Sequence, residues 1–239
     1  MPSQPGPLSG YRIIDLTTMI SGPMATGLLG DQGADVIKVE APGIGDLVRL
    51  LGRPREGITA TFATTNRNKR SIVLDLKDPA DLDAFRKLIA TADVVVQNFR
   101  PGVVERMGIG EDDLREIKPD LIYVSISGFG ETGPYAGKRV YDPIVQALSG
   151  LATIQGNRGV GRPRMMRLVI PDKVTAITAA QAITAALLAR ERSGMGQHVR
   201  LSMIDAMIAL SWPEGFAGHT FIGEEKWRKY LYQLQAARR

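Results

Sequence analysis

One aspartate stands where a carboxylate could do chemistry. Asp172 follows a short apolar run at 167–171 and precedes an alanine-rich helix that the pattern predicts over 174–189. An aspartate at the mouth of a helix is most often an N-cap, whose carboxylate accepts otherwise unpaired backbone N–H groups. The same position can hold a nucleophilic carboxylate, which the positive end of the helix would keep ionised. The residue alone leaves both interpretations open.

Cationic side chains follow the ends of predicted strands. Arg100 stands in an Asn-Phe-Arg-Pro-Gly turn, Arg106 lies on the next short helix, and Lys138 and Arg139 follow a glycine-rich stretch. Taken singly, each is by default a turn or surface residue. Three separate cationic sites that follow strand ends would suit the phosphates of a polyanionic small ligand.

Other chemistries find little support in the sequence. The two histidines, His198 and His219, are far apart in the chain, and no metal-binding set or Ser–His triad is evident. The glycines at 128, 130 and 133 match G-x-G-x-x-G, but Pro134 follows where a helix should begin, and no acid stands at the expected later strand end. We therefore expect no metal and no NAD, and we interpret the glycines as a loop near a ligand.

The elements that would position these residues alternate along the chain. Helical segments separate six apolar, β-branched runs, at 12–16, 35–40, 71–75, 93–97, 121–126 and 198–201. This alternation predicts an α/β fold: a doubly wound, mostly parallel, Rossmann-like sheet with helices on both faces. In that class ligands bind beyond the carboxyl ends of the strands, which is where Arg100 and the glycines would lie.

Composition narrows the functional class. The chain has 239 residues, 44% hydrophobic and 23% charged, which is ordinary globular composition without cysteine. Four of the five net positive charges lie at 228–239, which is weak evidence for nucleic-acid binding. The amino terminus lacks a signal-peptide pattern, and the helix at 174–189 is too short and polar to span a bilayer. We expect a cytoplasmic protein with no nucleic-acid or membrane partner.

Several stretches together resemble the family III CoA-transferases, such as formyl-CoA transferase and crotonobetainyl-CoA:carnitine CoA-transferase. Their combination and order are specific to that family, and the resemblance covers about residues 8–215. The stretches that carry it lie at 35–43, 68–75, 97–102, 125–135, 141–147 and 190–197.

The resemblance implies an organisation for the chain. Residues 1–10 would be an arm, 11–215 a Rossmann-like CoA-binding segment of the large domain, and 216–239 a helical tail or linker. Family members are considerably longer and add a second, smaller domain and a glycine-rich loop that closes over the active site. Neither is expected here, so the chain resembles a C-terminally truncated transferase: a fragment, a truncated product or half of a split enzyme. The family implies an interlinked homodimer, which this length does not favour.

The resemblance also implies the chemistry. Asp172 takes the place of the catalytic aspartate, which attacks an acyl-CoA thioester and forms an aspartyl anhydride and then an aspartyl–CoA thioester. An acceptor carboxylic acid finally receives the CoA, with no metal or redox cofactor. One family arginine is replaced by Ala41. The family's CoA-binding positions correspond here to Ile20, Ser21, Leu74, Asn98, Phe99, Arg100, Arg106 and Arg139.

Two alternatives stay open beside the transferase. The first is a non-catalytic CoA-binding fragment that needs a C-terminal partner, since the closing loop is expected to be missing. The second, less favoured, resembles the α-methylacyl-CoA racemases, which use a His-Asp pair where this chain has Tyr141-Asp142. Without that histidine the acid/base pair that moves the α-proton is incomplete.

Overall fold

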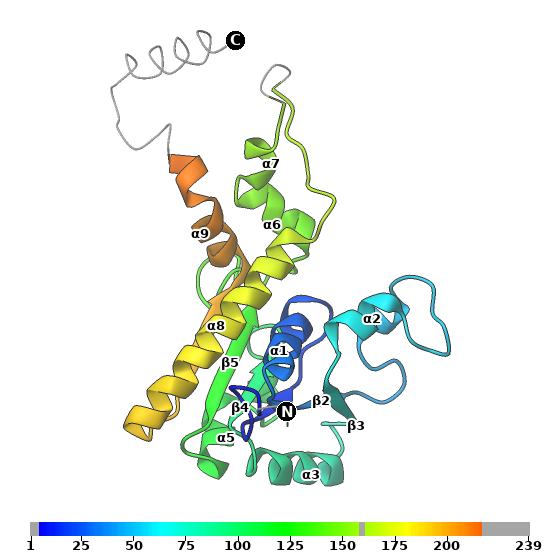
Figure 1. The fold of residues 1–239 in the computed structure, drawn as a ribbon, viewed down its shortest axis with the longest axis vertical. Helices are drawn as coiled ribbons and strands as arrows, with labels where there is room; N and C mark the ends of the chain where they lie inside the picture. The colour runs from blue at the N-terminus through cyan, green and yellow to red at the C-terminus, as the bar shows by residue number, and fades with distance from the viewer. Residues whose placement is uncertain (1–4, 158–160, 217–239) are drawn as a thin grey trace.

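Six parallel strands form the centre of the protein in a computed structural model, which describes residues 5–157 and 161–216 (Figure 1). Their spatial order is β3-β2-β1-β4-β5-β6, the order of a Rossmann-type doubly wound sheet. The α/β class expected from the alternating pattern is therefore confirmed. The strands are β1 (Arg12–Asp15), β2 (Asp35–Glu40), β3 (Lys69–Val73), β4 (Val94–Gln97), β5 (Ile122–Ser127) and β6 (His198–Ser202).

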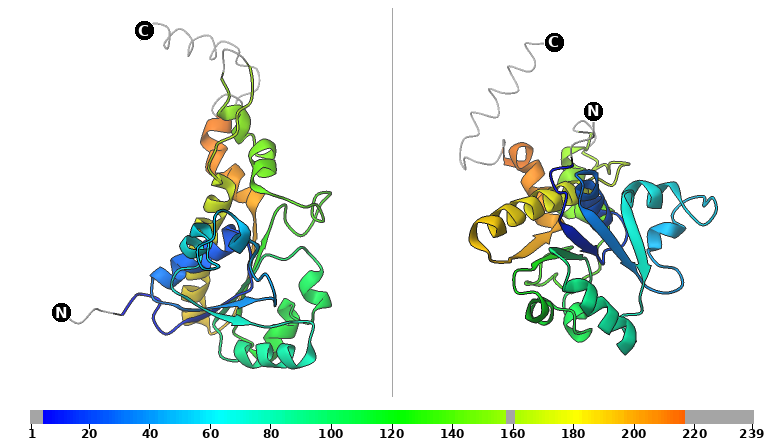
Figure 2. Two further views of the ribbon diagram at one scale, coloured as in Figure 1. Left: turned by 90° about the vertical axis from the view of Figure 1, so that its right-hand side faces the viewer. Right: turned by 60° about the horizontal axis from the view of Figure 1, so that its bottom comes forward.

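Helices cover both faces of this sheet (Figure 2). The helices α1 (Ser21–Asp31) and α8 (Ile170–Ser193) lie on one face, and α3 (Pro79–Ile89), α4 (Val103–Arg106) and α5 (Glu111–Ile117) lie on the other. Successive strand residues point to opposite faces. Thus Ile13 belongs to the α1/α8 core, whereas its neighbour Ile14 belongs to the core beneath α3 and α5.

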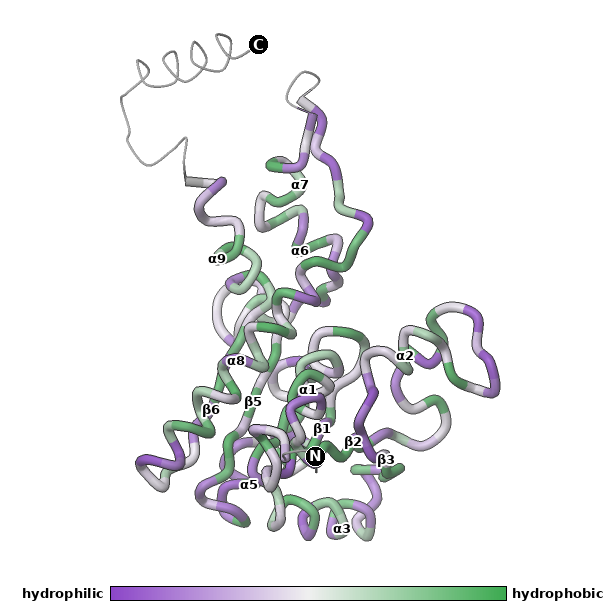
Figure 3. Tube along the Cα trace, viewed as in Figure 1, coloured by the Kyte–Doolittle hydropathy of each residue, from purple (hydrophilic) through white to green (hydrophobic). Residues whose placement is uncertain are grey.

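The closest helix pair is α1 against α8, and it joins residues far apart in the sequence (Figure 1). The buried face of α8 is built from small residues such as Ala176, Ala179 and Ala180, which let the two helix backbones approach. Hydrophobic residues run along much of α8, and its carboxyl end is hydrophilic (Figure 3). Gly194 ends the helix in the left-handed conformation with φ of 71°, as glycine readily does.

A second group of helices extends beyond the carboxyl edge of the sheet (Figure 1). The helices α6 (Asp142–Leu148), α7 (Leu151–Ile154) and α9 (Met203–Phe216) pack around a separate cluster that includes Val145, Leu151 and Met207. The helix α2 (Ala60–Thr65) and a 3₁₀ turn (Leu47–Leu50) lie between β2 and β3. No helix in the described part of the chain is both long and apolar enough to cross a membrane.

Element boundaries differ modestly from the prediction. The strand expected at 71–75 begins two residues earlier as β3, and α8 begins four residues before the predicted start at 174. Within the predicted arm at 1–10, Leu8 is buried in the α1/α8 core and its N–H donates to Gln32 O at 2.9 Å. The predicted tail from 217 onward lies outside the described residues.

A glycine substitution tests the close packing of the α8–β6 loop against the residue that precedes β5. A Cβ at Gly196 would lie 2.3 Å from the carbonyl oxygen of Leu121, so Gly196→Ala forces the backbone apart. We expect a loss of about 1–3 kcal/mol in the free energy of unfolding, measured by urea denaturation. Gly137→Ala is the matched control, because a Cβ there meets no atom within 4 Å. Equal urea midpoints for the two variants would contradict the packing argument.

Candidate active site

Asp172 lies where two helix N-termini meet. It is the third residue of α8, and the N-cap of that helix is Val169, so Asp172 is not the structural cap considered from the sequence. Its carboxylate instead faces the start of α1 across a cavity that Asp172 and Ser21 both line, where the backbone N–H and the hydroxyl of Ser21 act to lower its pKa. Ile20 is the N-cap of α1 and supplies no capping side chain. The positive end of α1 therefore lies next to a carboxylate on α8, where it favours the ionised form of that carboxylate.

A buried carboxylate, that of Asp142, lies beside the half-buried Asp172. Asp142 begins α6 and is only 5% exposed, and its Oδ2 accepts the backbone N–H of Asp172 at 3.4 Å. Gln146 Nε2 donates to Asp142 Oδ1 at 2.6 Å, while Gln146 Oε1 accepts the N–H of Met166 at 2.8 Å. Gln146 thus ties Asp142 to the segment that leads into α8.

The environment raises the pKa of Asp172 to about 6. Burial is the main cause, the nearby charge of Asp142 adds to it, and the hydrogen bonds from Ser21 oppose it. Burial also raises the pKa of Asp142. The direction is opposite to that expected from a helix terminus alone, because desolvation outweighs the helix end. A carboxyl group with this pKa is still mostly ionised at pH 7.

A cavity of about 270 Å³ opens beside Asp172, beyond the carboxyl ends of β1, β4 and β5. Three cationic side chains line it and are exposed, Arg100, Lys138 and Arg139. Lys138 stacks on Tyr135, with Nζ 4.0 Å from the ring centroid. The residues expected from the sequence that line this cavity are Ser21, Asn98, Phe99, Arg100, Arg139 and Asp172.

The remaining expected residues lie around this cavity rather than in its lining. Leu74 lines a neighbouring cavity of about 310 Å³, and Phe99 lines both. Arg106 is exposed at the end of α4 with its guanidinium near Gly102, and it lines none of the cavities described here. Ile20 does not line this cavity, but as the N-cap of α1 it precedes Ser21, which does.

The side-chain amide of Asn98 joins two strand-end loops. Asn98 Oδ1 accepts the N–H of Thr18 at 3.0 Å, and Asn98 Nδ2 donates to Thr18 O at 2.8 Å. Both ends of the amide are therefore used within the protein. The side chain therefore holds the β1–α1 loop against the β4–α4 loop, and its expected role in CoA binding stays a prediction.

Buried charges pin the β1–α1 loop from below. Lys38 is 1% exposed, and its Nζ lies 3.0 Å from the Asp46 carboxylate and donates to Thr17 O at 2.7 Å. Asp46 Oδ1 accepts the N–H of Met19 at 2.9 Å, which supports the positive φ of 72° at Met19. This network was not predicted from the sequence, although a lysine inside an apolar strand is a signal that could have shown it.

The same network continues to the end of β1. Lys69 Nζ lies 2.8 Å from Asp15 Oδ2 and donates to Pro23 O at 2.7 Å. Burial alone would raise the pKa of Asp15, but Lys38 and Lys69 outweigh it and hold that pKa well below its usual range. The start of α1, and with it Ser21, is thereby fixed to the sheet.

Comparisons with known proteins agree on one family. A profile of CoA-transferase family III matches residues 8–228. The succinate–glutarate CoA-transferase of Agrobacterium fabrum is 44% identical over 217 residues, which cover 88% of this chain and 54% of that protein. The acetyl-CoA:oxalate CoA-transferase of Acetobacter aceti is 43% identical over 209 residues, which cover 87% of this chain and 54% of that protein.

A solved structure shows the same fold. The crystal structure of a CAIB/BAIF family protein from Brucella suis superposes with a TM-score of 0.84 at 36% identity. The match covers 91% of this chain and 59% of that one. The chain therefore spans about half the length of the curated relatives it matches.

Replacing Asp172 tests its raised pKa through stability. A carboxyl group whose folded pKa of about 6 exceeds the unfolded value of about 3.9 favours the folded state when protonated. The contribution of Asp172 to the free energy of unfolding should therefore fall as the pH rises from 4 to 6. We expect Asp172→Asn to remove this loss, so that the variant exceeds the wild type in stability more at pH 7.5 than at pH 4.5. Urea denaturation at both pH values measures the difference, and the exposed Asp112→Asn is the control. A gap that does not change with pH would refute the raised pKa.

Replacing Lys38 tests the buried charge network. Lys38→Met leaves the Asp46 carboxylate buried without its cation, so we expect a loss of about 3–5 kcal/mol in the free energy of unfolding. Lys87→Met removes an exposed ion pair with Asp83 and should cost no more than about 1 kcal/mol. Chemical denaturation of both variants at pH 7 compares them. Similar small losses would show that Lys38 does not hold the loop.

Proposed function

The chain belongs to CoA-transferase family III, and from that membership we propose that it transfers CoA between an acyl-CoA thioester and a carboxylic acid. Asp172 is the proposed covalent nucleophile. The observation that carries the proposal is the placement of this carboxylate against the α1 N-terminus, at a cavity lined by Arg100, Lys138 and Arg139. The reactive group and the cations that suit phosphates or carboxylates face the same space.

The proposed reaction proceeds through two kinds of covalent intermediate at Asp172, a mixed anhydride and a CoA thioester. A carboxylate oxygen of Asp172 attacks the thioester carbonyl, the C–S bond breaks, and CoA leaves as a thiolate. The thiolate then attacks the aspartyl carbonyl of the mixed anhydride, which releases the donor carboxylate and leaves an aspartyl–CoA thioester. The acceptor carboxylate repeats these two steps in reverse, so that CoA ends on the acceptor and Asp172 is free again. No net proton is taken up or released.

The surroundings of Asp172 suit each part of this route. A carboxylate is a weak nucleophile, and a pKa of about 6 makes it more basic than an ordinary aspartate while leaving it mostly ionised at pH 7. The N–H and hydroxyl of Ser21, which favour the ionised form, are placed to orient the attacking carboxylate. Donors at the start of α1 also favour the negative oxygen that forms in each tetrahedral intermediate.

We propose small dicarboxylic acids as the acids exchanged. The relatives from Agrobacterium fabrum and Acetobacter aceti are named for succinate and glutarate and for oxalate. A second carboxylate on such an acid could pair with Arg139 or Lys138 while the first reacts at Asp172. The homodimer implied by the family and a cytoplasmic location are further proposals.

A second candidate function is CoA binding without turnover by this chain alone. It is favoured by the overlap with the curated relatives, because only about half of their length is matched here. Calorimetry with CoA tests what both candidates require, which is CoA binding. An assay of acyl-CoA formation separates them, because only the transferase forms a new acyl-CoA when a donor thioester and an acceptor acid are mixed.

The racemase alternative is not carried forward as a proposal. Tyr141 takes the place of the histidine that such an enzyme would need, and the residue is 61% exposed. No histidine is found among the described residues that line the Asp172 cavity. The acid/base pair needed to exchange an α-proton is therefore incomplete at this site.

Covalent trapping tests the proposed nucleophile. The chain is incubated with succinyl-CoA, quenched with hydroxylamine, and analysed by intact mass and peptide mapping. We expect an adduct on the peptide that carries Asp172, and none in Asp172→Asn, because an amide oxygen does not form the anhydride. Transfer to glutarate should fall by at least about a thousandfold in that variant, whereas CoA binding is retained.

The control is Asp112→Asn, an exposed aspartate outside this cavity, which should form the adduct like the wild type. Unchanged transfer in Asp172→Asn would overturn the proposed nucleophile. CoA binding with no adduct in the wild type would favour the second candidate function.

A further inference from the structure

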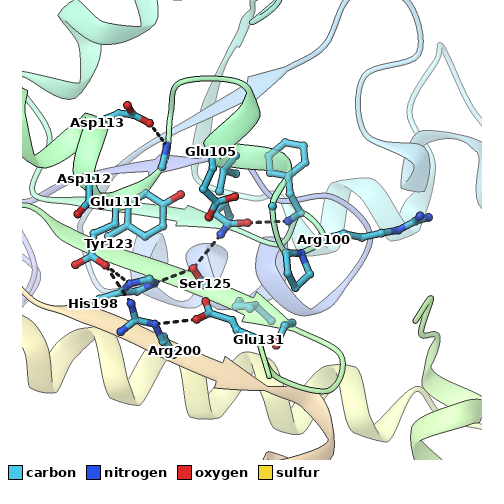
Figure 4. A pocket seen from close by; sticks show the side chains of 18 residues that line it. Arg100, Glu105, Glu111, Asp112, Asp113, Tyr123, Ser125, Glu131, His198 and Arg200 are labelled. Atoms are coloured by element: carbon cyan, nitrogen blue, oxygen red, sulfur yellow. Dashed lines mark hydrogen bonds and ion pairs between the residues drawn. The ribbon is translucent and has the colours of Figure 1, made fainter. Parts of the chain in front are cut away.

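A second cavity, of about 470 Å³, lies on the other face of the sheet, between α5 and β6 (Figure 4). It shares Phe99 and Arg100 with the Asp172 cavity. Among the side chains pointing into it are Ser125 and His198, from the neighbouring strands β5 and β6. The family resemblance assigned a role to neither residue.

A continuous chain of hydrogen bonds crosses this cavity (Figure 4). His198 Nδ1 bonds the Glu111 carboxylate, and His198 Nε2 lies 2.8 Å from Ser125 Oγ. Gln97 Nε2 donates to Ser125 Oγ at 2.9 Å, and Gln97 Oε1 accepts the backbone N–H of Phe99 at 2.8 Å. The chain therefore runs from α5 through three strands to the turn at the mouth of the Asp172 cavity.

The groups at the two ends of this hydrogen-bond chain limit which partner can donate in each of its hydrogen bonds. The N–H of Phe99 can only donate, and an ionised Glu111 can only accept. Gln97 must then donate to Ser125 and His198 must carry a proton on Nδ1; with a neutral ring, the Ser125 hydroxyl donates to His198 Nε2. Neutral His198 satisfies all four bonds, and a protonated His198 would have to donate toward Ser125, which would leave the buried hydroxyl proton without an acceptor.

The groups around His198 agree with a neutral ring. Burial is the main cause that lowers the pKa of His198, while Glu111 opposes the shift and Arg200 adds to it. Arg200 Nη2 lies 3.2 Å from Glu111 and Arg200 Nε lies 2.9 Å from Glu131, so both nearby acids are partly neutralised. The Tyr123 ring packs edge-on against His198 with centroids 5.1 Å apart.

The Ser–His–Glu order also resembles that of a hydrolytic triad, but its setting does not suit a nucleophile. Ser125 lies inside β5, paired with Gln97 on β4 and Arg200 on β6, so the neighbouring backbone N–H groups belong to the sheet. A triad serine needs free donors beside it for the oxyanion. At Ser125 the Gln97 amide is already committed between Oγ and the Phe99 turn.

We propose that Glu111, His198, Ser125 and Gln97 are positioning residues that fix the turn of Phe99 and Arg100 at the mouth of the Asp172 cavity. The chain of bonds holds the Phe99 N–H, and Phe99 lines all three cavities that meet there. Its effect on CoA binding rests on the proposed function, whereas its effect on the turn does not.

Two isosteric or near-isosteric substitutions test the direction of the chain. In Gln97→Glu, both oxygens of the new carboxylate can only accept hydrogen bonds. The Ser125 hydroxyl therefore turns to donate toward residue 97, and His198 Nε2 gains a proton in order to donate to Ser125. We expect the pKa of His198 to rise by about one unit or more, observed by nitrogen-15 NMR of the histidine-labelled full chain. His198 and His219 are the two histidines of the sequence, so His219→Gln assigns the signals. The charge of the new carboxylate alone would also raise this pKa, so the deciding readout is the tautomer: the neutral wild-type ring should carry its proton on Nδ1.

The second readout follows the turn itself. Ser125→Ala removes the link in the middle, and we expect hydrogen exchange at the Phe99 amide to accelerate about tenfold and the Kd for CoA to weaken about tenfold. Ser125→Thr keeps the hydroxyl on the strand and should restore both. A neutral wild-type ring protonated on Nε2, or unchanged Phe99 exchange in Ser125→Ala, would overturn the inference. A wild-type chain that binds no CoA would instead overturn the proposed function, while the two NMR readouts still decide the inference.

Discussion

The close approach of α1 and α8 is the constraint on which the rest of the site depends. Small residues such as Ala176 and Ala179 let the helices pack closely, and their N-termini then meet at the carboxyl edge of the sheet. Only this meeting places Ser21 against Asp172. Desolvation at the junction raises the pKa of the carboxylate, and the N–H of Ser21 limits that rise, so basicity and ionisation are balanced near neutral pH.

Two buried polar systems hold the loops around that junction. Lys38 and Asp46 pin the β1–α1 loop from beneath, and the Gln97–Ser125–His198 chain holds the β4–α4 turn from the other face. Buried charges and hydroxyls are costly unless every group is satisfied, so each system has few alternative arrangements. Asn98 joins the two loops directly, which links the two systems at the mouth of the cavity.

The proposed reaction and the proposed positioning residues are located on different sides of the sheet. On one side, Asp172 would carry the covalent steps beside exposed cations that suit a phosphate or carboxylate. On the other, the hydrogen-bond chain contains no group that needs to react and ends on a backbone N–H. Since the chain spans about half the length of its curated relatives, what it does alone is the central question for experiment.

The sequence by itself determined the α/β class, six strand positions to within about two residues, and the family, because hydrophobic periodicity and ordered motifs are local properties of the chain. It singled out Asp172 but not its setting. Only the tertiary structure decided that the start of α1 lies against the Asp172 carboxylate. It also decided that Asp142 lies beside Asp172. The same holds for His198, whose partners Ser125 and Glu111 are 73 and 87 residues away. Burial and long-range contacts set these interactions, and neither is written in local spacing.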